Sequence, residues 1–311
     1  MTSEVGETVS IVIPLHNEEG NVAPLVDALA SVREGGWEVV FVDDGSSDGT
    51  LDQLRIALQR FDWIRVVVLQ SRRGQAVALK AGFDHAAGQL LITMDGDLQN
   101  DPQDIKLIVD RLRKGAEFVI GRRLDRCDRW LDRKLPSWIA NRLITWSLRV
   151  PFRDIGCGLR GYRKHVVTKL WWWNEFHRYA SILAFHLGFS TDEVEVQSHP
   201  RLHGKAKYGL GRIGRILRDL TVLLAFTQAR GRASSLVGPL LGVGLLVCLI
   251  LPIALELVES SDFAIRVGSA VTGTVLASWL YFRMYCFRFY AVALWKQREE
   301  RSYEVRDLLG R

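Results

Sequence analysis

The sequence predicts an α/β fold with a mainly parallel sheet, followed by a membrane-associated C-terminal part. Short apolar segments alternate with helix-like segments from Val9 to Gly121, a pattern typical of parallel strands covered by helices on both sides. Polar clusters follow three of the apolar segments. A dense basic segment then precedes two long apolar runs.

Each element of the sheet domain follows from its local pattern. Strands are expected at short apolar runs and helices at longer stretches of helical periodicity, with Asn21 as the N-cap of the first helix. The expected strands are Val9–Ile13, Trp37–Asp43, Ile64–Leu69, Leu90–Met94 and Glu117–Ile120. The expected helices are Asn21–Arg33, Asp48–Arg60, Gly74–Ala87 and Pro102–Lys114.

Polar residues gather where three expected strands end. The clusters are Pro14–Glu18, Asp43–Asp48 and Asp95–Asp97. Taken singly, each is an ordinary turn or surface segment. Because ligands collect at the carboxyl ends of the strands in open α/β sheets, their common placement predicts a polar ligand site on this rim.

The strand Leu90–Met94 ends in two aspartates that suit a hard cation. Asp95 and Asp97 are two residues apart, so they share one face of an extended strand or converge in a turn, and Gln99 offers a third oxygen. Oxygen ligands favour Mg²⁺ or Mn²⁺ over zinc. The alternative is a surface turn that caps the helix beginning near Pro102.

Length and composition fit one large globular domain and a smaller addition. The chain has 311 residues, 48% of them hydrophobic, and is not compositionally disordered. Its four cysteines form no CxxC pair, so neither a disulfide framework nor a zinc site is indicated. The acidic N-terminus lacks the basic start and long apolar run of a signal peptide. We therefore expect the first domain to stay in the cytosol.

Three segments that contain the polar clusters after the strands together resemble the motifs of family 2 glycosyltransferases. The resemblance is strongest to the polyprenyl-phosphate glycosyltransferases related to dolichol-phosphate mannose synthase. The three segments are Ile13–Glu19, Val42–Thr50 and Met94–Gln99. Further matches are Gly121–Arg123, Asp154–Arg160, His177–Tyr179 and Arg201–Tyr208. The chain departs from the family at Gly96, where alanine is common, and at Lys205, where an acidic residue is usual.

The resemblance implies a Rossmann-like GT-A domain over residues 1–208 and an inverting, single-transfer enzyme. The donor would be a nucleotide diphosphate sugar, linked to UDP or GDP, and the acceptor a polyprenyl phosphate of the undecaprenyl or dolichyl type. The resemblance places the donor at Pro14, His16, Glu18, Asp43, Asp44, Asp95, Gly96 and Arg123. It gives Asp95, Asp97 and Gln99 as ligands of Mg²⁺ or Mn²⁺ on the diphosphate. The product would supply a lipid-linked sugar for an envelope glycan or lipid modification.

The chemistry of such a transfer explains these residue types. A leaving diphosphate gains negative charge, which a metal ion and guanidinium groups neutralise. The residues expected at the acceptor phosphate are Arg122, Arg160, Arg201, Lys205 and Lys207, and the expected catalytic residues are Asp97, Asp154 and Arg201.

Asp154 is the residue whose role the sequence leaves open. A phosphate monoester is already largely a dianion at pH 7, so a strong base is hardly required. Asp154 could act as a general base, position the acceptor or hold Arg160 and a neighbouring basic residue, or form a structural ion pair.

The segment from 209 to 232 reads as a basic amphipathic helix that lies in a membrane surface. Residues 201–232 contain eight Lys or Arg and one Asp. Gly209–Gly214 matches G-x-G-x-x-G, but no strand precedes it, so a dinucleotide site is not supported. An apolar stripe accompanies the basic residues, as in interfacial helices.

Two membrane-spanning helices are expected within residues 233–290, at about 233–255 and 264–285. The linking segment is acidic and both outer flanks are basic, so the positive-inside rule puts the catalytic domain and the 291–311 tail in the cytoplasm. We thus expect a multi-pass protein of the inner membrane. Membrane lipids, and not nucleic acid, are the expected partner of the basic segment. The sequence leaves open whether the protein forms a homo-oligomer.

Two further segments allow two interpretations each. The charged run Arg122–Lys134 is either a mobile loop that closes over the acceptor phosphate or a solvated face. Trp171–Trp173 suits either core packing or the membrane interface.

Two other functions are alternatives to a single sugar transfer. A processive polysaccharide synthase shares the nucleotide motifs, but its Q-x-x-R-W element is absent here. A non-catalytic nucleotide- or lipid-binding membrane partner is less compatible with a complete set of metal and phosphate residues.

Overall fold

The computed structural model describes residues 7–124, 148–172, 176–200, 223 and 303–310. Within these residues a single eight-stranded sheet has the order β7-β5-β6-β4-β1-β2-β3-β8. The strands are β1 (Val9–Leu15), β2 (Trp37–Asp43), β3 (Ile64–Leu69), β4 (Leu90–Thr93), β5 (Phe118–Arg123), β6 (Arg160–Arg163), β7 (Thr191–Val196) and β8 (Val305–Leu309). The helices are α1 (Glu19–Val32), α2 (Thr50–Arg60), α3 (Gln75–His85), the 3₁₀ turn η1 (Pro102–Asp104), α4 (Ile105–Arg113), α6 (Lys164–Val167), η2 (Phe176–Tyr179) and α7 (Ala180–Leu187).

Most neighbouring strands are parallel, as the sequence predicted. β1 pairs in parallel with β2 and β4, β2 with β3, and β5 with β7. Two antiparallel strands make the sheet mixed. β6 lies between β4 and β5, and β8 pairs with β3 at the edge of the sheet. The sequence did not predict β6, β7 or β8.

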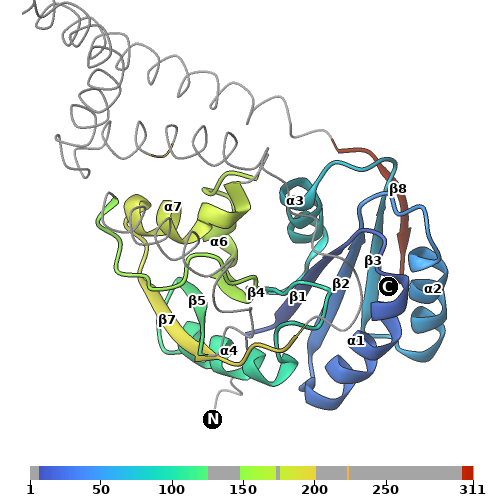
Figure 1. The fold of residues 1–311 in the computed structure, drawn as a ribbon, viewed down its shortest axis with the longest axis horizontal. Helices are drawn as coiled ribbons and strands as arrows, with labels where there is room; N and C mark the ends of the chain where they lie inside the picture. The colour runs from blue at the N-terminus through green and yellow to red at the C-terminus, as the bar shows by residue number, and fades with distance from the viewer. Residues whose placement is uncertain (1–6, 125–147, 173–175, 201–222, 224–302, 311) are drawn as a thin grey trace, which may run out of the picture. The chain divides into compact units, whose positions relative to one another are not determined.

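Helices cover both faces of the sheet. Val12 on β1 faces α3, because a Cβ on Gly82 of α3 would lie 2.3 Å from the Val12 side chain. Gly161 on β6 faces α4, where its Cβ would lie 2.4 Å from Ile108. The sheet register places these two strand residues on opposite faces. Figure 1 shows α1 and α4 on one side of the sheet and α3 and α7 on the other.

The first helix begins two residues before the expected cap. Its N-cap is Glu18, and Asn21 lies buried within the first turn. The Asn21 side chain donates to Glu18 Oε2 at 2.6 Å, so it is held by a partner inside the turn and the prediction of an Asn21 cap was wrong. At the helix near Pro102 the cap is Asp101, whose carboxylate accepts from the Gln103 amide at 2.9 Å.

Trp171 and Trp172 belong to the core. They are 6% and 7% exposed, and the Trp172 ring stacks edge-on against Phe83 of α3 and Tyr162 of β6 at 4.7 and 5.9 Å. The Trp172 Nε1 group donates to the Val167 carbonyl at 2.9 Å, which satisfies its polar end. Core packing therefore accounts for these two residues, and Trp173 lies outside the described residues.

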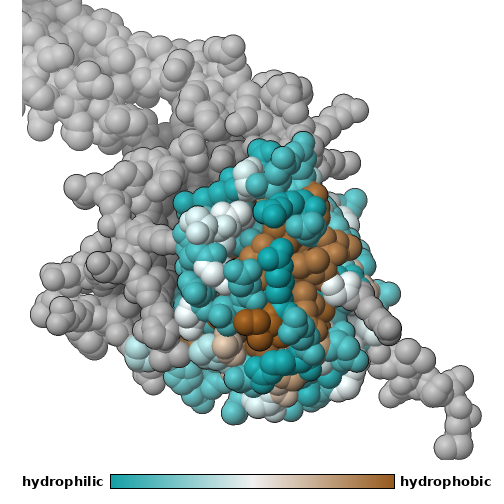
Figure 2. Space-filling model, turned by 90° about the vertical axis from the view of Figure 1, so that its right-hand side faces the viewer, coloured by the Kyte–Doolittle hydropathy of each residue, from teal (hydrophilic) through white to brown (hydrophobic). Residues whose placement is uncertain are grey.

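The C-terminal segment contributes an edge strand. β8 runs antiparallel to β3 with Val66 opposite Leu309 and Val68 opposite Asp307. Figure 2 turns this side toward the viewer and shows an apolar strip between hydrophilic margins. α2 and β8 each contribute one large exposed apolar side chain. These are Ile56 and Leu308, each 51% exposed.

Several expected segments lie outside the described residues. They are the charged run from Asp125 onward, most of the 209–232 segment, both expected spans and Arg201, Lys205 and Lys207. In the described part of the chain, no helix combines the length and apolar character that a membrane span requires.

Candidate functional site

A pocket opens where the sequence predicted a site, at the carboxyl ends of β1, β2 and β4. Ten of the expected residues line it: Pro14, His16, Glu18, Asp44, Asp95, Gly96, Asp97, Gln99, Arg123 and Arg160. Asp43, Arg122 and Asp154 are not among the residues that line it. The pocket thus combines carboxylates with arginines in one lining.

The loops after β1 and β2 are joined by hydrogen bonds. The Asn17 side chain accepts from the Ser47 amide at 2.8 Å, and the Asn17 amide donates to Ser46 Oγ at 3.0 Å. Asn17 has a φ of 56°, a left-handed conformation that asparagine tolerates better than most residues. The His16 Nδ1 atom lies 2.9 Å from the Asp44 carbonyl oxygen. These contacts hold the first two predicted clusters as one rim.

Both aspartates of the second cluster accept backbone amides. Asp43 is buried and accepts from Ser46 at 3.1 Å, which fixes the turn after β2. Asp44 accepts from Arg73 at 2.6 Å and Gly74 at 2.8 Å, the two residues before α3. Burial raises the pKa of Asp44, and these amides together with His16 offset part of that rise.

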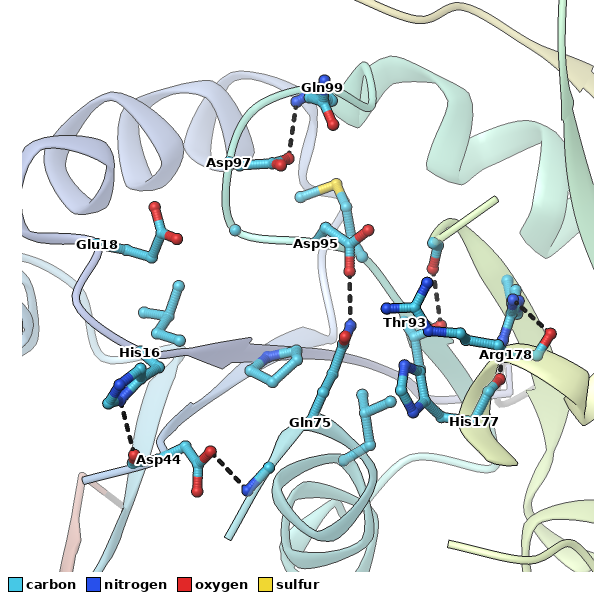
Figure 3. Close-up of a pocket in the computed structure, with 18 of the residues that line it drawn as sticks. His16, Glu18, Asp44, Gln75, Thr93, Asp95, Asp97, Gln99, His177 and Arg178 are labelled. Atoms are coloured by element: carbon cyan, nitrogen blue, oxygen red, sulfur yellow. Dashed lines mark hydrogen bonds between the residues drawn. The ribbon is translucent and has the colours of Figure 1, made fainter. Parts of the chain in front are cut away.

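Asp95 and Asp97 follow β4 on one loop, as Figure 3 shows. Asp97 is 7% exposed, and its Oδ1 accepts from the Gln99 amide at 3.2 Å. Leu98 between Asp97 and Gln99 has a φ of 58°, a conformation costing about 1 kcal/mol that persists where the surroundings impose it. Gln75, the first residue of α3, donates from Nε2 to Asp95 Oδ1 at 2.8 Å.

The charge of this loop suits a divalent cation. Burial and then the charge of Asp97 raise the pKa of Asp95, and the charges of Arg160 and Arg178 compensate only in part. A bound cation would remove this electrostatic cost. No group of three or more His, Cys, Asp or Glu side chains is gathered for a metal among the described residues. Mg²⁺ commonly binds through one or two carboxylates plus substrate phosphates and water, so the donor set fits that kind of site.

Asp154 forms an ion pair with Arg123. Its Oδ2 accepts from Arg123 Nε at 2.8 Å and its Oδ1 from Nη2 at 3.1 Å, in the two-pronged geometry that favours Arg–carboxylate pairs. The Gly156 amide also donates to Oδ1, at 3.1 Å. Burial alone would lower the pKa of Arg123, but the hydrogen bonds and charge of Asp154 outweigh it and raise that pKa.

Among the described residues, Asp154 thus takes part in an ion pair, one of the roles that the sequence left open. Arg123 is the described ion-pair partner, whereas the printed hydrogen bonds of the Arg160 guanidinium go to backbone carbonyls. Glu193 fixes the backbone at this point by accepting from the amides of Arg153 and Asp154, at 2.8 and 3.1 Å. Asp154 is 5% exposed, so its carboxylate is held behind Arg123.

Two of the three arginines expected at the acceptor phosphate lie in the described part of the chain, and both have protein partners. Arg160 is 4% exposed, and its guanidinium donates to the carbonyls of His177, Ile155 and Arg178. It therefore ties β6 to η2. Arg122 pairs with Glu195 on the neighbouring strand β7.

Sequence reasoning missed Gln75, Gly158, Arg72 and Arg178 as residues of the site. All four line the pocket. A Cβ at Gly158 would lie 2.2 Å from Asp95 Oδ2, so only glycine leaves room for this carboxylate. Gly158 and Arg178 fall within the motif matches Asp154–Arg160 and His177–Tyr179, but those matches gave no hint of which side chains these two residues face.

Cys157 lies between these glycines and is buried. Burial raises the pKa of its thiol to about 11, with Arg123 acting in the opposite direction. The Asn100 amide approaches its sulfur at 3.7 Å. The thiol is thus protonated at neutral pH and has a packing role.

Known proteins resemble the chain in sequence and in fold. The model of the family described as glycosyl transferase family 2 matches residues 10–171. Dodecaprenyl-phosphate galacturonate synthase of Rhizobium johnstonii is 39% identical over 251 residues, which cover 78% of this chain and 74% of that protein. Undecaprenyl-phosphate 4-deoxy-4-formamido-L-arabinose transferase of Edwardsiella ictaluri is 38% identical over 250 residues, covering 78% and 76%.

A solved structure shares the fold. Glucosyl-3-phosphoglycerate synthase from Mycobacterium tuberculosis, in complex with Mn²⁺, uridine-diphosphate and phosphoglyceric acid, superimposes with a TM-score of 0.58 at 18% identity and covers 74% of this chain and 81% of that chain. The family match spans more than half of the sequence, and the pocket lies on the rim that its motifs form. The chain therefore belongs to glycosyl transferase family 2.

Proposed function

We propose that this protein is an inverting glycosyltransferase that moves one sugar from a nucleotide diphosphate sugar to a polyprenyl phosphate. The observation that carries this proposal is one pocket lined both by the carboxylate loop Asp95–Gln99 and by Arg123, Arg160 and Arg178. Such a pocket suits a phosphate-rich donor. The two relatives named above supply the class of acceptor, because both are named for transfer to a polyprenyl phosphate.

The donor end of the pocket would hold the nucleotide sugar. Asp95, Asp97 and Gln99 would hold Mg²⁺ or Mn²⁺, which would supply positive charge to the diphosphate as it leaves. Glu18 and His16 line the neighbouring wall, where the nucleoside would lie. Asp44 supports that wall through the amides before α3.

The acceptor needs little activation. An oxygen of the polyprenyl phosphate would attack the anomeric carbon as the bond to the diphosphate breaks, with inversion at that carbon. The electron pair of the broken bond leaves with the nucleoside diphosphate. The phosphate monoester is largely a dianion at pH 7, so no proton has to be removed for the attack. Asp154, paired with Arg123, would keep a guanidinium directed at the phosphates.

The proposed location is the cytoplasmic face of the inner membrane. The basic segment 209–232 would lie in the interface, and two spans would follow within 233–290. The pairing of β8 with β3 supports an even number of crossings, because both strands must then lie on the same side of the membrane.

Transfer by the purified full chain tests the proposal. It would be incubated with a panel of UDP- and GDP-linked sugars, uronic acids included, with Mg²⁺ or Mn²⁺ and undecaprenyl phosphate. We expect one labelled sugar per lipid, released by mild acid, with loss of transfer in EDTA. Labelled chains of several sugars would favour a processive synthase, and absence of transfer from every donor would contradict the proposal.

A further inference from the structure

The carboxylate of Asp95 is held from two sides. On one side Gln75 Nε2 donates to Oδ1 at 2.8 Å. On the other side Oδ2 lies so close to Gly158 that a Cβ on this glycine would clash with it. Figure 3 shows the Gln75 side chain reaching up from the start of α3 to Asp95. An amide that donates to a carboxylate selects one orientation of that carboxylate. Gln75 therefore has the geometry of a residue that aims Asp95.

Gln75 is itself placed by a second carboxylate. Its helix begins after Gly74, whose φ of 93° gives the chain a sharp entry, and no side chain of the N-cap satisfies the first amides. Asp44 meets the chain just before this point and accepts from Arg73 and Gly74 at 2.6 and 2.8 Å. Since helix starts with unsatisfied amides fray, Asp44 fixes the position from which Gln75 reaches Asp95.

These contacts form a continuous path between two parts of the pocket. The path runs from the end of β2, through the turn before α3, to the loop after β4. Each step is a hydrogen bond to a carboxylate, and neither Asp44 nor Gln75 belongs to the two-aspartate loop itself. Groups that orient metal ligands in this way typically change metal affinity by about 10–100-fold when removed.

We propose that Gln75 is a positioning residue for the divalent-cation site and that Asp44 acts on that site through the Arg73–Gly74 turn. This inference rests on the proposed function, because it assumes that Asp95 and Asp97 hold the cation. It assigns Asp44 a role at the metal in addition to its place on the nucleotide wall. Asp44 and Gln75 therefore act on the metal site as one unit.

Mn²⁺ binding to the full chain without nucleotide tests the inference, with electron paramagnetic resonance as the readout. Gln75→Met keeps the length of the side chain and removes the donor, and Gln75→Asn keeps the amide but shortens its reach. We expect both to bind Mn²⁺ about tenfold more weakly than the wild type. Gln103→Met, at an exposed helix start away from the pocket, is the matched control and should bind as the wild type does.

A double-mutant cycle tests the path from Asp44. In Asp44→Asn an NH₂ group replaces one carboxylate oxygen, so one of the Arg73 and Gly74 amides loses its acceptor. This variant should therefore also weaken Mn²⁺ binding. Combined with Gln75→Met, the two losses should not add, because both act through the same contact. Additive losses would show that Asp44 acts on the metal by another route and overturn that half of the inference.

Two outcomes would overturn the role of Gln75. One is that folded Gln75→Met and Gln75→Asn bind Mn²⁺ with the same affinity as the wild type. The other is weaker binding of UDP in EDTA by these variants with Mn²⁺ affinity unchanged, which would make Gln75 a direct nucleotide contact. Failure of the proposed function would give a different result. The wild type would then show no Mn²⁺ binding that is lost in Asp97→Ala, and it would transfer no sugar.

Discussion

Asp97 is a proposed ligand of the divalent cation. It is buried, it lines the pocket, and the Gln99 amide on the same loop donates to it. We expect Asp97→Ala to lower the transfer rate by about a hundredfold or more, because a charge that stabilises the leaving diphosphate would be lost. The melting temperature should change little. Steady-state transfer rates and thermal melts measure the two effects.

The control for this variant is Asp52→Ala. Asp52 lies on the exposed surface of α2, where its only described ion pair is with Arg55 at 3.1 Å. Exposed pairs of this kind contribute at most about 1 kcal/mol, so activity and stability should both stay near the wild-type values. Full activity of Asp97→Ala, or of the wild type in excess EDTA, would refute the metal assignment.

Asp154 is expected to position Arg123 and not to remove a proton. Asp154→Asn should destabilise the fold by about 2 kcal/mol, since the half-buried Arg123 loses a charged acceptor. The rate should fall about tenfold, less than for Asp97→Ala, because the metal site stays intact. In both the wild type and this variant the rate should decline below about pH 6, where the acceptor phosphate gains a proton.

The pH–rate profile separates this role from general-base catalysis. A base must be ionised to act, so the rate would fall with decreasing pH through the pKa of Asp154, and Asp154→Asn would abolish that limb along with most of the activity. A profile of unchanged shape at a reduced rate supports positioning. A loss as large as that of Asp97→Ala, with the acid limb removed, would contradict it.

At the scale of elements, the connection from Asp154 to Leu159 organises one side of the pocket. Asp154 holds Arg123, a Cβ on Gly156 would lie 3.3 Å from the Arg123 guanidinium, and Gly158 leaves space for Asp95. The Gly158 carbonyl also accepts from Thr93 Oγ1 at 3.0 Å, which joins the loop to the end of β4. One short loop thus supports both the acidic and the basic wall.

Gly158→Ala tests this packing. The new methyl group would lie 2.2 Å from Asp95 Oδ2, so the carboxylate has to move and the metal site with it. We expect Mn²⁺ affinity and transfer rate to fall at least about tenfold. Gly35→Ala is the control, because a Cβ there meets no atom within 4 Å. Unchanged Mn²⁺ affinity in Gly158→Ala would show that Asp95 tolerates displacement.

At the scale of the whole molecule, β8 links the C-terminal end of the chain to the catalytic sheet. Val66 and Leu309 are opposite each other on the β3–β8 pair, and a Cβ on Gly310 would lie 2.5 Å from the Ile64 carbonyl. The Gly310 φ of 89° allows this close passage. The two ends of the sheet domain must therefore occupy the same compartment.

We expect both termini to be cytoplasmic. Cleavable epitope tags placed before residue 1 and after residue 311 should be digested by protease in inside-out membrane vesicles and protected in sealed right-side-out vesicles. A tag on a known periplasmic domain of the same vesicles provides the control for orientation. Protection of one tag and digestion of the other in the same vesicles would rule out the expected topology.

The parallel core of the sheet and the rim of the site could be predicted from the sequence. Strands β1 to β5 and their helices were predictable because apolar periodicity is local, and the carboxyl ends of parallel strands meet at one edge. For this reason the motifs after those strands were enough to assign Asp95, Asp97 and His16 to the pocket.

The side chains that meet across that edge could be identified only in the folded chain. Asp154 and Arg123 are 31 residues apart and Gln75 and Asp95 are 20 apart, and their pairing depends on where loops of different elements converge. β8 escaped prediction for the same reason: five residues of partly polar character become a strand only because the open edge of β3 supplies their hydrogen-bond partners.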